Sequence, residues 1–109
     1  MFIPSLIYWL FIIYQIHYTY VKGYIAIYFR ESVQKDLKQI PQNDLKKIFN
    51  RVYLLESEPR PYGCEKLTGQ ERYRIRQGDY RIMYEIRDKE LVIWIVKIGH
   101  RKDVYRFNN

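Results

Sequence analysis

Two runs of alternating side chains, joined by a Gly-Asp pair, constrain the fold of this chain more than any other feature of its sequence. They form the stretch RYRIRQGDYRIMYEI, which spans 72–86. Arginines alternate with Tyr73 and Ile75 before the turn, and apolar side chains alternate with polar ones after it. Successive side chains of a strand point to opposite faces, and a Gly-Asp pair between two such runs favours a tight turn. The stretch predicts a β-hairpin over 72–77 and 80–87.

Two further strands and two helices are predicted around this hairpin. The run YIAIYF over 24–29 has the aromatic and β-branched composition of a strand, and LVIWIVKI over 91–98 is apolar on both faces, as in a strand inside a sheet. A first helix over 33–40 follows Ser32 as its N-cap and ends at Pro41.

The second helix opens at Asn43 or Asp44 and carries one apolar stripe, made by Leu45, Ile48, Phe49, Val52 and Leu55. Helices with apolar stripes cover an apolar sheet face. We therefore expect an α+β fold of order β-α-α-β-β-β, in which two N-terminal helices pack on one face of a mostly antiparallel sheet.

Positive charge is concentrated in the second half of the chain. The formal net charge is +7, and 72–109 holds ten Lys and Arg against five Asp and Glu, whereas 22–71 holds nine against seven. The hairpin should bring Arg74, Arg76 and Arg81 together on the open face of the sheet. A basic surface fits nucleic acid, an anionic membrane or an acidic protein, and composition does not choose among them.

The sequence offers no pattern for a metal or a disulfide. Cys64 is the only cysteine, so no disulfide can form within the chain, and a reducing compartment such as the cytoplasm fits. No group of His, Cys and Asp has metal-ligand spacing. We expect neither a metal nor a cofactor.

The first twenty residues, 1–20, form an apolar leader without a charged side chain. Its continuous apolar run, 6–14, is shorter than the about 20 residues that span a bilayer, and the basic start of a secretory signal is missing. The leader is either a membrane segment or an upstream extension outside the working protein. We favour the extension, with a working domain over 21–109 that opens at Val21, and we do not expect membrane binding.

Three motifs in the expected order resemble a known family. The helix pair, then PRPYGCEKLTG, YRIRQGDYRIMYEI and IGHRKDVYR, is similar to the RelE branch of the RelE/ParE superfamily of toxins from toxin–antitoxin systems. The resemblance covers about 21–106. It implies a RelE-like fold, a metal-independent endoribonuclease that cuts mRNA in the A site of the ribosome, and a cognate antitoxin.

The resemblance also implies roles for particular residues. The basic pair of the first hairpin strand falls on Arg74 and Arg76, which we expect, with Lys66, to bind RNA phosphate. Arg81 on the second strand, and Arg101 and Tyr105 after the last strand, fall on catalytic positions. Lysines often stand where this chain has Arg74 and Arg76, and a lysine stands at His100 in some members.

Those departures matter for proton transfer, because an arginine does not accept a proton at neutral pH. His100 is one candidate, since imidazole gains and loses a proton near neutral pH. Tyr105 is the other, since neighbouring arginines would stabilise its phenolate. Either ring could instead stack on a base, and base and acid stay unassigned.

Other conspicuous residues have plainer interpretations. We expect Arg72 and Arg87 to be solvated hairpin charges, Lys97 to be an ordinary strand charge, and Tyr80 and Tyr84 to face the core. Two alternatives to the ribonuclease also stay open. One is a ParE-like inhibitor of DNA gyrase on the same fold, and the other is an inactive or membrane-tethered copy.

Overall fold

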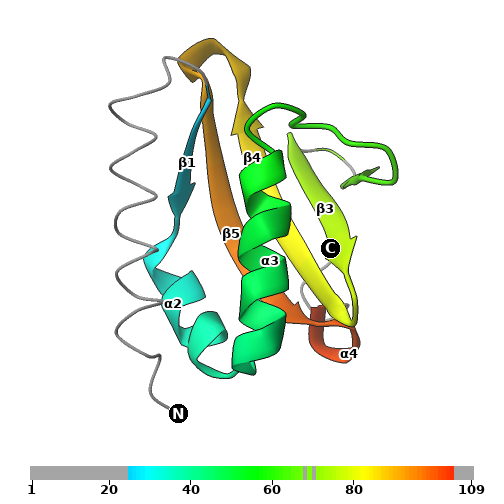
Figure 1. Cartoon of the computed structure of the whole chain (residues 1–109). Coiled ribbons are helices and arrows are strands. Elements are labelled where there is room, and N and C mark those ends of the chain that lie inside the picture. Colours follow the sequence, from blue (N-terminus) through cyan, green and yellow to red (C-terminus); the bar gives the residue numbers. More distant parts are fainter. Residues whose placement is uncertain (1–24, 68, 70, 105–109) are drawn as a thin grey trace.

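One five-stranded sheet organises the molecule, in the order β1-β5-β4-β3-β2. The computed structural model describes residues 25–67, 69 and 71–104 (Figure 1). Adjacent strands are antiparallel except β1 and β5, which are parallel. The strands are β1 Ala26–Phe29, β2 Glu65–Lys66, β3 Arg72–Gln77, β4 Tyr80–Arg87 and β5 Val92–His100. The predicted α+β class is confirmed, and β5 is interior as expected.

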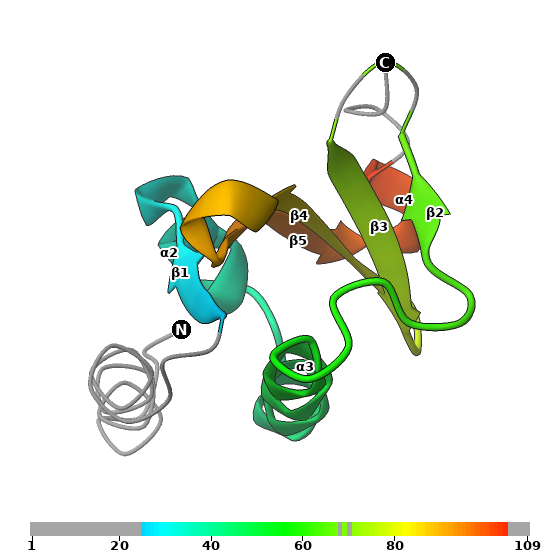
Figure 2. The same ribbon diagram turned by 90° about the horizontal axis from the view of Figure 1, so that it is seen from above.

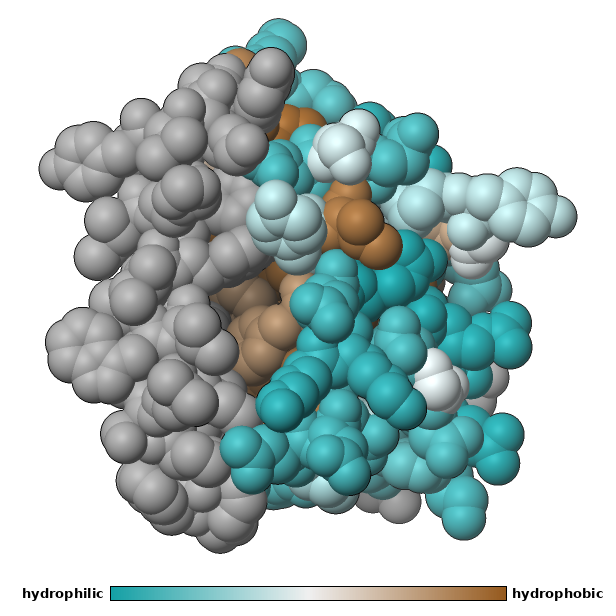
Figure 3. Space-filling model, viewed as in Figure 1, coloured by the Kyte–Doolittle hydropathy of each residue, from teal (hydrophilic) through white to brown (hydrophobic). Residues whose placement is uncertain are grey.

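Two helices pack against one face of this sheet. They are α2, Glu31–Lys38, and α3, Gln42–Leu54. Figure 1 shows α3 running along the strands, Figure 2 shows it end-on to one side of the sheet, and Figure 3 shows that the outer surface on this side is largely hydrophilic. The alternation of the hairpin sends Tyr73 and Ile75 into the same core as the apolar stripe of α3. The core comprises Ile27, Val33, Leu37, Ile40, Leu45, Ile48, Val52, Leu55, Tyr73, Ile75, Ile82, Tyr84, Ile86, Ile93, Ile95 and Ile98.

Tyr84 lies in this core, as predicted, and fastens the loop that follows α3. Its side chain is fully buried, and its hydroxyl donates a hydrogen bond to the carbonyl oxygen of Pro59 at 2.6 Å. Burial raises the pKa of Tyr84, so the phenol keeps the proton that it donates. The loop carrying the two prolines is thereby held against the hairpin.

The element boundaries differ from the prediction at several points. Ser32 is not an N-cap: Arg30 holds the cap position and its amide bonds the Ile95 carbonyl at 3.0 Å, so the chain leaves β1 directly into α2. Helix α3 begins at Gln42, directly after Pro41, and so starts before the predicted Asn43 or Asp44. Residue 24, the predicted start of β1, lies outside the described residues.

Two short elements of the described chain were not predicted. They are β2 and α4, Arg101–Val104, which follows β5 near the β3–β4 turn (Figure 1). Both are too short to show a periodicity. The connection between β4 and β5 is the 3-10 turn η2, Asp88–Glu90.

The leader, 1–20, lies outside the described residues. Among the residues that the structure describes, none of the helices combines the length and the hydropathy that spanning a bilayer requires.

Candidate functional site

Four of the predicted site residues lie at one end of the sheet, beside the β3–β4 turn, although not all on the same face. Arg76 of β3 pairs directly with Arg81 of β4, and Arg81 pairs with Gly99 of β5. His100 ends β5, where it pairs with Tyr80 and therefore points to the helix face, opposite to Arg76 and Arg81, and Arg101 begins α4. Because directly paired residues point to the same face, with Cβ atoms about 5 Å apart, the two arginines form one cationic cluster.

The turn fixes the guanidinium group of Arg81. Its Nη1 atom donates to the carbonyl oxygens of Gly78 at 3.2 Å and Tyr80 at 3.1 Å. Gly78 has a φ of 59°, a left-handed conformation that glycine adopts without strain. Both hydrogen bonds use Nη1, so the other guanidinium nitrogens of Arg81 can bind an anion with bidentate geometry.

The same turn also holds the start of α4. The amide of Arg101 donates to the carbonyl oxygen of Asp79 at 2.7 Å, and the Arg101 Nε atom lies 3.9 Å from the Asp79 carboxylate. The Gly-Asp pair therefore positions catalytic candidates from two different elements. The sequence predicted the turn, but it did not predict the hydrogen bond between the turn and Arg101.

His100 is oriented by the backbone of α4 and by an aromatic neighbour. Its Nδ1 atom accepts a hydrogen bond from the Lys102 amide at 3.3 Å, and its ring meets Tyr80 edge-on at 5.8 Å. Because Nδ1 is the acceptor, the neutral ring carries its proton on Nε2. Burial raises the pKa of Tyr80, with the charges of Asp44 and Asp79 acting in the same direction, so its phenol stays protonated.

A small cavity lies next to His100 at the edge of β5. It has a volume of about 210 Å³ and is lined by Asp36, Gln39, Ile40, Tyr80, Lys97, Ile98, Gly99, His100 and Asp103. Asp36 of α2 accepts from the Lys97 ammonium at 2.9 Å and from the Ile98 amide at 3.1 Å. Lys97 is therefore not an ordinary strand charge.

The Asp36 contacts compensate for the short β1. Pairing between β1 and β5 ends at Ile95, so the edge of β5 beyond that point runs past β1. Asp36 accepts a hydrogen bond from the amide of Ile98 on this edge, and thereby fixes the backbone of β5 two residues before His100. Sequence reasoning missed Asp36, since an acidic residue in a helix carries no signal of a strand partner.

Two predicted phosphate ligands are in contact with carboxylates. Arg74 is buried, with an exposed fraction of 8%, and its guanidinium contacts Glu65 at 3.1 and 3.2 Å. Arg74 shares the face of Arg76 and Arg81, as expected, but it is not open to solvent there, because the unpredicted β2 places Glu65 opposite Arg74. Lys66 lies on β2 with its ammonium 3.3 Å from Glu71.

Tyr105 lies outside the described residues. Within the ranges that the structure describes, no group of three or more His, Cys, Asp and Glu side chains could hold a metal ion.

Comparison with known proteins identifies the family. Residues 27–105 match the family model described as the ParE toxin of the type II toxin–antitoxin system parDE. The chain is 32% identical over 80 residues to RelE1 of Methanocaldococcus jannaschii, a protein named as a toxin, covering 70% of this chain and 89% of that one. It is 29% identical over 85 residues to toxin RelG of Mycobacterium tuberculosis, covering 74% and 95%.

A solved structure is similar as well. The archaeal RelE–RelB complex from Pyrococcus horikoshii matches with a TM-score of 0.63 and 30% identity, covering 75% of this chain and 99% of that chain. The fold, the family model and the curated relatives agree. The chain therefore belongs to the RelE/ParE family of toxins from type II toxin–antitoxin systems.

Proposed function

We propose that this toxin is an mRNA endoribonuclease that acts on ribosome-bound message in the cytoplasm and is neutralised by a cognate antitoxin. The observation that carries the proposal is the cationic pair of Arg76 and Arg81, at the end of the sheet where β5 ends at His100 and α4 begins at Arg101. Fixed positive charge suits a scissile phosphate, and His100, on the helix side of the same end of the sheet, is a group that can exchange a proton.

The reaction is attack of the ribose 2′-oxygen on the neighbouring phosphorus, with departure of the 5′-oxygen. Arg81, held by the turn carbonyls, stabilises the charge that develops on the non-bridging oxygens, and Arg76 and Arg101 add to the cationic field. The protein must also take a proton from the 2′-hydroxyl and give one to the leaving oxygen.

We assign this proton transfer to His100 and Tyr105 together, without dividing base from acid. The hydrogen bond from the Lys102 amide occupies His100 Nδ1, so Nε2 is the ring nitrogen that we assign to proton transfer. Arg74 and Lys66, whose cationic groups contact carboxylates, add to the positive charge around the cluster.

The antitoxin partner is supported by the relatives. The similar archaeal toxins from Pyrococcus horikoshii and Methanococcus jannaschii were both solved as complexes of RelE with RelB. The basic surface of this toxin fits a partner that supplies negative charge.

A gyrase inhibitor is the second candidate, because the matching family model is that of a ParE toxin. The ribonuclease is favoured by His100 and Tyr105, since a gyrase binder needs no proton-transfer group beside its arginines.

Two parallel assays separate the candidates. The full chain is incubated with ribosomes programmed with mRNA, and separately with DNA gyrase, ATP and supercoiled plasmid. We expect cleaved message in the first reaction and unchanged plasmid topology in the second. Intact message together with gyrase-dependent DNA breaks would reverse the assignment.

A further inference from the structure

A second cluster of side chains lies on the same sheet, about four residues along β4 from Arg81. Tyr28, Trp94, Glu85 and Arg72 pair in turn across β1, β5, β4 and β3. Directly paired residues point to the same face, and this face is opposite to the core. We call these four residues the transverse row.

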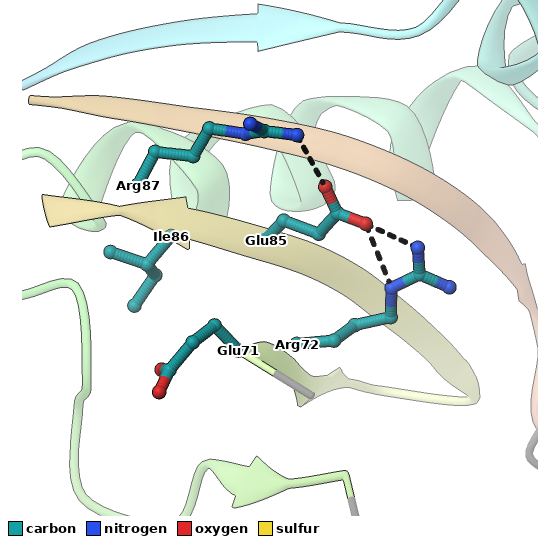
Figure 4. Close-up of a pocket in the computed structure, with 5 residues that line it drawn as sticks. All are labelled: Glu71, Arg72, Glu85, Ile86 and Arg87. Carbon is teal, nitrogen blue, oxygen red and sulfur yellow. Dashed lines mark hydrogen bonds and ion pairs between the residues drawn. The ribbon is translucent and has the colours of Figure 1, made fainter. Parts of the chain in front are cut away.

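Three arginines surround the carboxylate in this row. Glu85 contacts Arg30 at 3.1 Å, Arg87 at 3.7 Å and the guanidinium of Arg72, and Figure 4 shows Arg72 and Arg87 converging on it. Burial alone would raise the pKa of Glu85, but Arg72 and then Arg30 and Arg87 outweigh it, so the pKa is lowered and the carboxylate is ionised at neutral pH.

One carboxylate balances one of these three charges. Arg30 and Arg87 also remain accessible, with exposed side-chain fractions of 44% and 49%, whereas Glu85 is 17% exposed. An open cavity of about 330 Å³ adjoins the cluster, lined by Glu71, Arg72, Glu85, Ile86 and Arg87. Its other carboxylate, Glu71, already accepts from Lys66 and Tyr73. The cluster thus presents net positive charge to solvent.

The other half of the row is aromatic. The rings of Tyr28 and Trp94 are partly exposed, with centroids 5.1 Å apart and planes inclined by 32°. Two rings beside exposed arginines are the combination that binds single-stranded nucleic acid, because bases stack on the rings while phosphates meet the cations.

We propose that the transverse row, with Arg30 and Arg87, is a second binding site for single-stranded RNA. A base packs on the tilted Tyr28–Trp94 pair, and the flanking phosphates bind Arg30 and Arg87. Glu85 forms an ion pair with Arg72 and orients the side chains of Arg30 and Arg87. This inference rests on the proposed function for the identity of the strand, which is the message being cut.

The position of the site supports its role beside the cleavage cluster. Four residues of strand between Arg81 and Glu85 correspond to about 13 Å. A nucleotide bound at the transverse row is therefore not next to the scissile phosphate. The row would hold a part of the message that lies away from the bond being cut.

The test uses the full chain, made by cell-free synthesis, and a fluorescent 12-nucleotide RNA of mixed sequence. Every 2′-hydroxyl of the RNA is methylated, so it lacks the nucleophile and stays intact. Fluorescence anisotropy gives Kd at several salt concentrations for wild type, Trp94→Leu, Trp94→Phe and Arg30→Ala. Tyr53→Leu and Lys47→Ala on α3 are controls for an exposed aromatic and an exposed cation.

Stacking and phosphate contact predict different signatures. Trp94→Leu should weaken binding about 5- to 100-fold with an unchanged salt slope, because stacking releases no counterion, and Trp94→Phe should recover most of the loss. Arg30→Ala should weaken binding and also lower the slope of log K against log salt by about 0.7. Both α3 controls should bind as wild type does.

Several results would overturn the proposal. They are absence of RNA binding by wild type at low salt, wild-type affinity in Trp94→Leu, and an equal loss in Tyr53→Leu. An acidic antitoxin segment is the competing occupant, and variants that bind RNA normally but lose the antitoxin would assign the row to that protein instead. Because the probe cannot be cut, this outcome is independent of whether the toxin cleaves ribosome-bound message.

Discussion

The arginines of the hairpin differ in what their guanidinium groups contact, although the sequence presents them as one series. Arg81 is held by two turn carbonyls, Arg74 is buried against Glu65, and Arg72 is tied to Glu85. Arg76 is exposed beside Arg81. Their expected contributions therefore separate into catalysis for Arg81 and structure for Arg74 and Arg72.

The first prediction concerns Arg81. Arg81→Ala should lower the rate of message cleavage by about 10²–10³-fold, because a preorganised stabiliser of developing charge is lost. Its free energy of unfolding should change by less than ~0.5 kcal/mol, since the side chain is not part of the core. Lys47→Ala on α3 is the matched surface control and should retain full activity. Equal activity of the two variants would remove Arg81 from the mechanism.

The second prediction concerns proton transfer. His100→Gln and Tyr105→Phe should each slow cleavage of ribosome-bound message far more than they weaken ribosome binding, because each keeps a polar or aromatic side chain of similar shape but loses the exchangeable proton. Single-turnover rates and ribosome co-sedimentation measure the two effects. If both variants cut at the wild-type rate, the two residues only form part of the binding surface.

At the scale of elements, the strands that carry the site are held by side chains from other elements. Asp36 of α2 fixes the edge of β5, Glu65 of β2 binds Arg74 of β3, and Arg30 after β1 reaches Glu85 of β4. These contacts join segments distant in sequence. Local alternation therefore forms the hairpin, and polar contacts between elements set its place in the sheet.

A third prediction tests the Glu85 contacts through pH. The lowered pKa means that the ion pairs stabilise the fold above the ordinary glutamate value of about 4.3, and that this stabilisation is lost as the pH falls through the lowered value. Glu85→Gln should lower the free energy of unfolding by about 1–2 kcal/mol at pH 7. The difference from wild type should shrink below about pH 4.

Urea denaturation at pH 7 and pH 3 measures this difference. Glu90→Gln, at an exposed position of η2, is the matched control and should change stability by less than ~0.5 kcal/mol at either pH. A penalty for Glu85→Gln that is the same at both pH values would mean that packing, and not charge, is what the glutamate contributes.

At the scale of the whole molecule, the family match begins at residue 27, shortly after the apolar leader. We propose that 21–109 is the working domain. This fragment should fold cooperatively and be toxic on expression, because it contains every element from β1 to α4. Intact-mass measurement of the natively expressed protein should find the short form. A full-length protein in the membrane fraction would contradict the proposal.

The fifth prediction concerns the partner. A cognate antitoxin should be encoded next to the toxin, restore growth when the two are expressed together, and co-purify as a complex. Its binding should weaken as salt rises, because the partner neutralises a basic surface. If the neighbouring gene does not restore growth and its product does not co-purify with the toxin, the prediction of an antitoxin partner is wrong.

The sequence by itself determined the hairpin, the apolar stripe of α3 and the α+β class, because the repeats of strands and helices are local. It also determined which cations and rings are available for chemistry. Only the tertiary structure decided that Arg74 is buried while Arg76 is exposed, that β1 runs parallel to β5, and that Tyr28, Trp94, Glu85 and Arg72 form one row. Those outcomes depend on strand order and register, which bring together residues up to 66 positions apart (28 to 94), and no local pattern encodes that distance.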